Sequence, residues 1–236
     1  MLAPTITWEL LVMSSSHVFG HSEGAISGEI PPGRYYREYV WQAINDATVP
    51  SWLNATGTVT IDSVANNAGK IKLATTAVAN NAARIELAHN IRYEYFAAVD
   101  LIVHGWTFDT DDTSKIEPAL GIDHWDNNHG GRFSQPNTGG RVVGRIHNAA
   151  VGDVTKTMRE RWVGDSHGNK SKSIMVRAYP RDGGIALFRD GELVDSFFDL
   201  TKWVTAGAVK PVVEIATREA VSHWMSFGLV AVRMWS

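Results

Sequence analysis

The sequence predicts an all-β protein, a two-sheet antiparallel β-sandwich that follows an irregular N-terminal arm. Short apolar runs separated by Gly, Asn and Asp turns recur at least ten times after residue 50, and apolar residues almost never follow the 3.6-residue period of a helix. The chain has 236 residues and 44% hydrophobic content, enough to bury one sandwich core. We therefore expect one principal domain over residues 51–236.

Residues 1–50 contain few alternating runs. The segment includes the break Pro31-Pro32-Gly33 and ends in an aromatic and basic cluster at residues 34–41. An irregular terminus has to be held by its own domain or by a partner to be ordered. We expect residues 1–50 to dock on another subunit.

The strands begin at residues 56–62. Residues 64–74 then recur as residues 78–88 with eight of eleven positions kept, and each copy has an Asn-rich turn followed by an alternating run. Two copies of this length predict a meander, because a solenoid needs more repeats. A longer strand is expected at residues 92–104.

Further strands are expected at residues 120–122, 140–147, 209–216 and 224–235. The strongest signal is a three-stranded meander over residues 173–179, 185–189 and 192–198, in which Asp190-Gly191 forms the second turn. Asp-Gly between apolar runs favours a tight hairpin, since both central positions of a type I′ turn need positive φ. The one helical turn expected covers residues 199–203, with Asp199 as its cap.

Composition excludes several classes of function. A net charge of −3 gives no basic field for nucleic acid, and zero cysteines exclude disulfides, thiol catalysis and zinc-thiolate sites. No apolar run has the length of a membrane span. The apolar segment at residues 6–13 carries Glu9 and has no basic residue before it, so we expect no signal peptide.

The segment LFRDGELV at residues 187–194 resembles a strand-turn-strand found late in concanavalin A-like jelly-roll domains. These domains occur in lectins, laminin G modules and polysaccharide-cleaving enzymes. The resemblance implies a jelly-roll sandwich whose ligand is a carbohydrate. The glucanase branch carries an acid-x-acid-x-x-acid strand, and this sequence has no such strand.

The polysaccharide lyase branch offers two looser resemblances. Residues 84–87 (RIEL) are similar to its Arg-x-Glu-Leu-Arg strand, and residues 145–147 (RIH) to its Gln-Ile-His strand. The resemblance implies that Arg84 and Glu86 lie where a uronate is neutralised and that His147 transfers the proton. The second Arg, the Gln and the tyrosine motif are absent here, and an exposed pair of Arg84 with Glu86 is the alternative.

Two loops carry dense polar chemistry. Asp109, Asp111 and Asp112 form an oxygen-rich loop that is a weak candidate for structural calcium, with a plain solvated acidic turn as the alternative. The following segment has the aromatic and forked polar side chains that bind sugars. The candidate ligand-binding residues are Trp106, His124, Trp125, Asp126, Asn128 and Arg132.

We therefore expect a non-enzymatic surface recognition or assembly module without a cofactor. Lectin-like sandwiches of bacteriophage tail and capsid-surface proteins resemble this case, because they reach glycans without a signal peptide. The resemblance implies a virion or extracellular location after cytoplasmic assembly, glycan and other virion subunits as partners, and an oligomer. The alternatives are a polysaccharide lyase or glycoside hydrolase of the same fold, and a purely structural subunit.

Overall fold

The computed structural model is all-β, and the part of the chain that it describes contains no helix. No described segment is therefore a helix long and apolar enough to cross a membrane. The described residues are 17–20, 36–42, 48–62, 70–89, 91–92, 96–123, 129–136, 140–163, 173–203 and 208–235.

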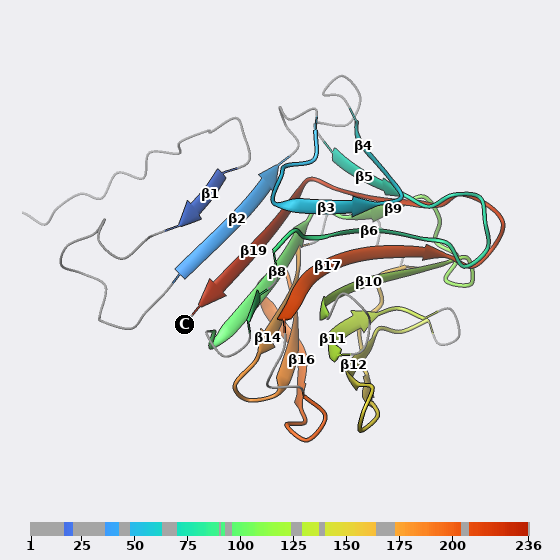
Figure 1. The fold of residues 1–236 in the computed structure, drawn as a ribbon. Coiled ribbons are helices and arrows are strands. Elements are labelled where there is room, and N and C mark those ends of the chain that lie inside the picture. The colour runs from blue at the N-terminus through green and yellow to red at the C-terminus, as the bar shows by residue number, and fades with distance from the viewer. Residues whose placement is uncertain are drawn as a thin grey trace, which may run out of the picture.

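Two large antiparallel sheets form the layers of a sandwich (Figure 1). The seven-stranded sheet has the order β1-β2-β19-β8-β14-β15-β16. Its strands are β1 (His17–Gly20), β2 (Tyr36–Gln42), β8 (Ala98–His104), β14 (Ser173–Tyr179), β15 (Gly184–Arg189), β16 (Glu192–Phe198) and β19 (Leu229–Trp235).

The opposite sheet has the order β13-β12-β11-β10-β17-β6-β3, and β7 also pairs with β17 to make it eight-stranded. Its strands are β3 (Leu53–Thr56), β6 (Ala82–Leu87), β7 (Ile91–Arg92), β10 (Ile116–Asp123), β11 (His129–Ser134), β12 (Val143–Asn148), β13 (Val154–Thr157) and β17 (Ala208–Thr217).

A small third sheet has the order β4-β5-β18-β9. Gly57, with φ of 86°, separates β3 from β4, and Gly228 separates β18 from β19, so two expected strands are each divided between two sheets. The strands of this sheet are β4 (Thr58–Asp62), β5 (Lys70–Ala74), β9 (Thr107–Phe108) and β18 (Trp224–Phe227).

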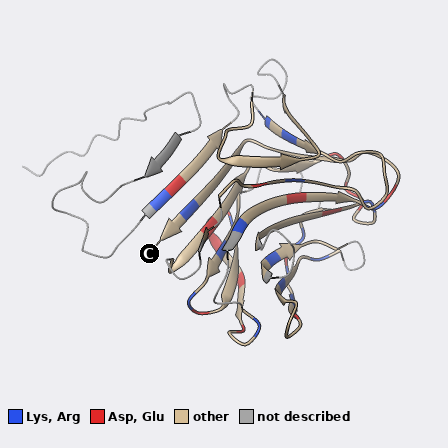
Figure 2. Cartoon of the chain, in the orientation of Figure 1, with Lys and Arg blue, Asp and Glu red and all other residues tan. Residues whose placement is uncertain are grey.

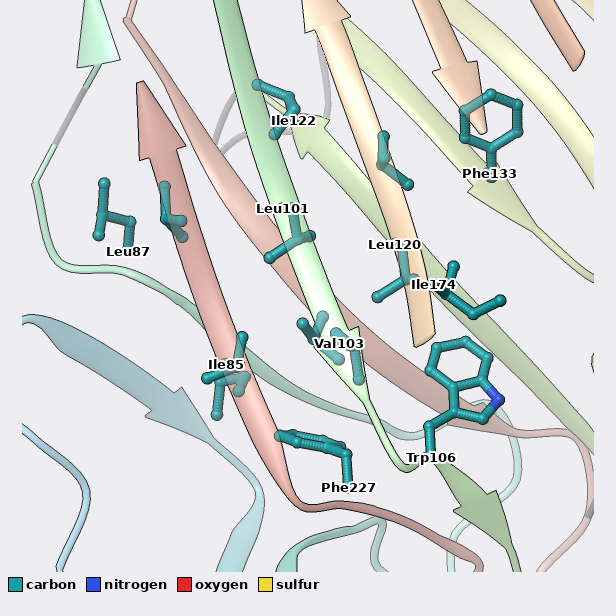
Figure 3. Close-up of a cluster of buried hydrophobic side chains, with 14 of the residues drawn as sticks. Ile85, Leu87, Leu101, Val103, Trp106, Leu120, Ile122, Phe133, Ile174 and Phe227 are labelled. Carbon is teal, nitrogen blue, oxygen red and sulfur yellow. The ribbon is translucent and has the colours of Figure 1, made fainter. Parts of the chain in front are cut away.

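The core lies between the inner faces of the two large sheets (Figure 3). Ile85 and Leu87 of β6 are each 1% exposed, and Ile174 and Val176 of β14 are fully buried. The residues between them on each strand are half-buried on the outer faces. This alternation fixes which side chains reach each outer surface.

The predicted meander is confirmed. β14, β15 and β16 are consecutive antiparallel neighbours, and Asp190 and Gly191 have φ of 51° and 86°, as the tight turn requires. Asp199 accepts hydrogen bonds from the backbone N–H groups of Thr201 and Lys202 at 3.0 and 3.2 Å, so it caps a turn without a helix.

The predicted meander of the two repeat copies is wrong. The strand of the first copy, β5, pairs with β4 and β18, whereas that of the second, β6, pairs with β3 and β17. At the connection, Asn80 adopts a φ of 62° and its N–H donates to the Thr217 carbonyl at 2.9 Å. Similar strands thus joined different sheets, because their long-range partners decided the pairing.

The predicted domain boundary at residue 50 is corrected by β2. This strand pairs with β19 along its whole length, and Tyr39 and Trp41 are 3% and 0% exposed in the core. The rings of Tyr39 and Trp52 lie 5.4 Å apart. Residues 36–42 therefore belong to the sandwich. Most of the remaining arm lies outside the described residues, so its docking stays a prediction.

Trp41→Ala tests this correction. We expect it to lower the free energy of unfolding by about 3–5 kcal/mol, because a buried indole is lost and a cavity is left. Val78→Ala is the control, since Val78 is 60% exposed in a turn. Equal urea midpoints for the two variants would show that β2 is not part of the core.

Candidate functional site

Charged side chains occupy the outer face of the eight-stranded sheet. Arg84 and Glu86 lie on either side of the buried Ile85 in β6, so strand alternation turns both outward. In the neighbouring β17, Glu214 is opposite Arg84 and Lys210 lies on the same face. Two adjacent strands thereby present acids and bases next to each other.

These side chains form a connected set of ion pairs. Nε of Arg84 lies 3.7 Å from Oε2 of Glu86 and 3.6 Å from Oε2 of Glu214, and Nζ of Lys210 donates to Oε1 of Glu86 at 3.0 Å. Nη1 of Arg132, on β11, lies 3.8 Å from Oε1 of Glu214. We call these five residues the charged band.

The charged band is unusually well buried for an outer face. Its side chains are only 13–21% exposed. Nε and Nη2 of Arg84 are buried and have no hydrogen-bond partner in the structure. A buried donor without an acceptor costs about 1–3 kcal/mol. Because both nitrogens are buried, an acceptor from a ligand or from water would satisfy them once the neighbouring side chains move aside.

Small residues separate the two sides of this face. Ala119 of β10 lies opposite Glu214, and Gly121 lies opposite Arg132. A Cβ at Gly121 would come within 2.7 Å of the Cβ of Arg132, so this position has no room for a side chain. β10 therefore has only small side chains at these two positions, between the longer polar side chains of β17 and β11.

A second polar cluster continues the face onto β12. Nε of Arg145 donates to Oδ2 of Asp153 at 2.6 Å, and Nδ1 of His147 contacts the other carboxylate oxygen. Arg145 is directly opposite Arg132 in the sheet. Burial opposes ionisation of Asp153, but the hydrogen bonds from His147 and Arg145 hold the pKa of this carboxyl below its usual range.

The arrangement suits a ligand rich in hydroxyl groups. Arginine and lysine only donate hydrogen bonds and ionised carboxylates only accept them, whereas a hydroxyl does both. Neighbouring hydroxyls could bridge Arg84 and its flanking carboxylates, each satisfying one donor and one acceptor. The face thus has the chemistry to bind a polyol.

The predicted recognition loop connects two strands of this sheet, β10 and β11. His124, Trp125, Asp126 and Asn128 are outside the described residues. The strands on either side are placed, with Asp123 opposite Lys210 and Gly130 opposite His147. The loop therefore leaves and re-enters the sheet next to both polar clusters. Arg132 is on the face, and its role in ligand binding stays a prediction.

The expectation that Trp106 contacts a ligand is wrong. Trp106 is 1% exposed, and its ring packs edge-on against Phe108 and Trp162, with centroids 4.9 Å apart in both pairs. Figure 3 shows the indole among aliphatic core side chains near Ile174. Trp106 comes two residues after the end of β8, and its large apolar surface is buried in the core.

The structure does not bring the lyase candidates together. Arg84 and Glu86 are on β6 and His147 is on β12, four strands away in the sheet. At roughly 4.8 Å per strand, the separation is about 19 Å along the sheet. One sugar ring cannot contact both ends, so the implied triad of Arg84, Glu86 and His147 is corrected.

The acidic loop shows no ligand cage. Asp112 accepts hydrogen bonds from the N–H and Oγ of Ser114 at 2.9 and 2.7 Å, Oδ2 of Asp109 lies 3.0 Å from Nδ1 of His223, and Asp111 is exposed. Among the described residues no three potential ligands gather around one point. Calcium binding stays a prediction without structural support.

Sequence reasoning missed four members of these clusters, and Arg145 of β12 is one of them. Lys210 and Glu214 alternate with buried residues of β17, so the period of two could have placed them on one face. Asp153 lies in the connection between β12 and β13, where no short motif marks it. Asp153 comes close to Arg145 only because the chain turns back after β12.

No protein-family model matches the sequence, and no curated protein does either. Solved structures do match its fold. The carbohydrate recognition domain of Emp47p has a TM-score of 0.55 at 12% identity over 81% of this chain and 92% of that domain. The carbohydrate recognition domain of Emp46p in its potassium-bound form gives 0.54 at 9% identity, over 77% and 88% of the two chains.

The binding domain of botulinum neurotoxin DC, solved with rat synaptotagmin II, has a TM-score of 0.54 at 11% identity. The match covers 76% of this chain but only 42% of the neurotoxin domain. These similarities confirm the jelly-roll β-sandwich of lectin-like domains. They say nothing about a phage origin, which stays a prediction.

The cluster around Asp153 predicts a pH-dependent contribution to stability. A carboxyl whose pKa is lowered by folding stabilises the protein at neutral pH, and this contribution is lost as the pH falls through the folded pKa. Asp153→Asn should therefore destabilise the protein at pH 7, and the difference from wild type should shrink below about pH 4. Urea unfolding at several pH values measures it, and a difference that stays constant down to pH 2 would contradict the assignment.

Proposed function

We propose that this protein is a non-enzymatic carbohydrate-recognition module that binds glycan on the outer face of the eight-stranded sheet. One observation carries the proposal. The charged band holds a largely buried arginine between two carboxylates at ion-pair distance, and two of its guanidinium nitrogens have no hydrogen-bond partner in the structure. Sugar hydroxyls supply the acceptors and donors that this set needs.

Similarity in fold supports the proposal without deciding it. The domains of Emp46p and Emp47p are carbohydrate recognition domains, and this chain corresponds to most of their length. A structure of botulinum neurotoxin type C concerns cell entry that depends on two ganglioside molecules, but there the match covers only 42% of the neurotoxin chain. Because folds host many functions, the argument depends on the charged band itself.

The loop at residues 124–128 supplies the second part of the proposed site. Stacking of a sugar ring on Trp125, beside His124, Asp126 and Asn128, would complement the hydrogen bonds offered by the charged band. The described ends of the loop, at Asp123 and Gly130, are in register with Lys210 and His147. A glycan on the face would therefore lie next to this loop.

The setting that we propose is the surface of a phage particle, tail or capsid, with the chain outside the cell after lysis. The support is the fold and the surface chemistry of a glycan-binding module. Residues 1–16 and 21–35, outside β1 and β2, are the segments proposed to dock on other virion subunits. Mass spectrometry of purified particles tests this setting, and absence of the chain from them would remove it.

Arg84→Ala tests the binding site. Against the best ligand from a panel of immobilised glycans, we expect the affinity to fall about tenfold or more, because hydrogen bonds to charged groups contribute about 1.5–3 kcal/mol. Arg84→Lys should recover little, since lysine lacks the forked donors. Calorimetric titration gives the affinities, and thermal unfolding shows that each variant is folded.

Arg181→Ala is the matched control, because Arg181 is an exposed residue in the turn between β14 and β15 of the other sheet. It should bind like wild type. Equal losses in the two variants, or no bound glycan in the panel, would contradict the proposal. Release of unsaturated uronate ends from a polymer would show a lyase instead.

A further inference from the structure

An apolar row crosses the outer face of the seven-stranded sheet. Strand register places one apolar residue from each of six neighbouring strands directly opposite the next, from β2 to β16. We call this set the apolar row. It consists of Val40, Ala231, Ile102, Met175, Phe188 and Leu193.

This row is long, and its exposure varies from strand to strand. Leu193 is 57% exposed, Ala231 is 2% exposed, and the other four side chains are half-buried on the sheet surface. Five strand spacings give a length of about 24 Å. An antiparallel sheet with one solvated face normally turns polar residues outward. A contiguous apolar strip there indicates a surface that is covered by a partner.

A row of alternating charges runs beside the apolar row. Glu38, Arg233, Asp100 and Arg177 are opposite one another on β2, β19, β8 and β14. Nε of Arg233 donates to Glu38 at 2.5 Å, and Arg177 donates two hydrogen bonds to Asp100 at 2.6 and 2.8 Å. Figure 2 shows acidic and basic positions alternating across β2, β19 and β8.

We propose that the partner is a second copy of this chain, packed sheet against sheet around a two-fold axis parallel to the strands. Such an axis reverses the order of the strands and leaves the position along each strand unchanged. The row of charges reads acid, base, acid, base from β2 to β14, and in the dimer it lies against the same row in the opposite order. Glu38 faces Arg177 of the other copy, so the direct contact between the rows joins opposite charges. Arg233 lies over Asp100 of the other copy, whose carboxylate is 1% exposed and already bound by Arg177.

The same two-fold axis also brings the apolar rows of the two copies against each other. With the axis between β19 and β8, four of the six residues of each row meet in reverse order, so Val40 faces Met175 and Ala231 faces Ile102 of the other copy. Phe188 and Leu193 then lie beyond β2 of the other copy. A two-fold axis along the rows would instead place each charge against its own copy, which is repulsive. The face is thus self-complementary in the way that an isologous dimer requires.

This dimer would leave both charged bands free. They lie on the opposite sheet of each protomer, so the two copies would present them on the two far sides of the assembly. If the ligands are fixed on one flat surface, only one charged band of the dimer would contact them. The dimer could instead cross-link soluble polymers or separate particles, one at each band. The proposal goes beyond glycan recognition and does not depend on it.

Sedimentation of the full chain tests the proposal. Wild type should be a dimer that dissociates on dilution, and Met175→Glu or Val40→Lys should raise the dissociation constant at least tenfold, because each would bury an unpaired charge. Val78→Glu, on an exposed turn, is the control and should remain a dimer. Thermal unfolding shows that each variant is folded.

Mixing the two variants tests the orientation. In the proposed dimer Val40→Lys faces Met175→Glu of the other copy, so an equimolar mixture should recover dimers that neither variant forms alone. An axis along the rows gives no such recovery, and its absence would overturn the orientation. A wild type that is monomeric at every concentration, or a Met175→Glu variant as dimeric as wild type, would overturn the proposal itself.

Discussion

The packing of the two large sheets against each other is the interaction on which the rest of the structure depends. It buries Ile85 and Leu87 of one sheet against the layer that holds Ile174 and Val176 of the other. Because side chains alternate along a strand, committing one face to the core determines the other face completely. A register slip of one residue would exchange the charged band for core residues, so the core also fixes the surfaces.

The two outer faces differ in whether their charged groups are satisfied by hydrogen bonds within the chain. On the eight-stranded sheet, Arg84 is placed among carboxylates with donors left unsatisfied, a state that a polar ligand improves. On the seven-stranded sheet, Arg177 holds Asp100 with two hydrogen bonds, and Trp235 donates to the same carboxylate at 3.1 Å. Those charges are satisfied internally, so the remaining gain there comes from covering apolar surface. This difference separates the face proposed for glycan from the face proposed for a second copy.

The sequence predicted what local chemistry decides. The Asp190-Gly191 turn and its strands followed from the need for positive φ, and the all-β class followed from alternation. The wrong predictions concern features that depend on pairing between strands far apart in the sequence. Nothing in the local sequence shows that β5 and β6 join different sheets, that Trp106 turns into the core, or that three strands separate Arg84 from His147. Part of the charged band could be predicted, because Arg84 and Glu86 lie two residues apart on one strand. Glu214 could not be predicted as their neighbour, because it reaches them only through the pairing of β17 with β6.

The central claim is that the outer face of the eight-stranded sheet binds glycan, and mapping amide chemical shifts during titration with the best ligand tests it most directly. The account predicts that the largest changes fall on β6, β17, β10 and β11, around Arg84, Glu214, Gly121 and Arg132. Small changes should occur across β8 and β14, which lie in the other sheet. Changes concentrated around Ile102 and Met175, with none at Arg84, would contradict it.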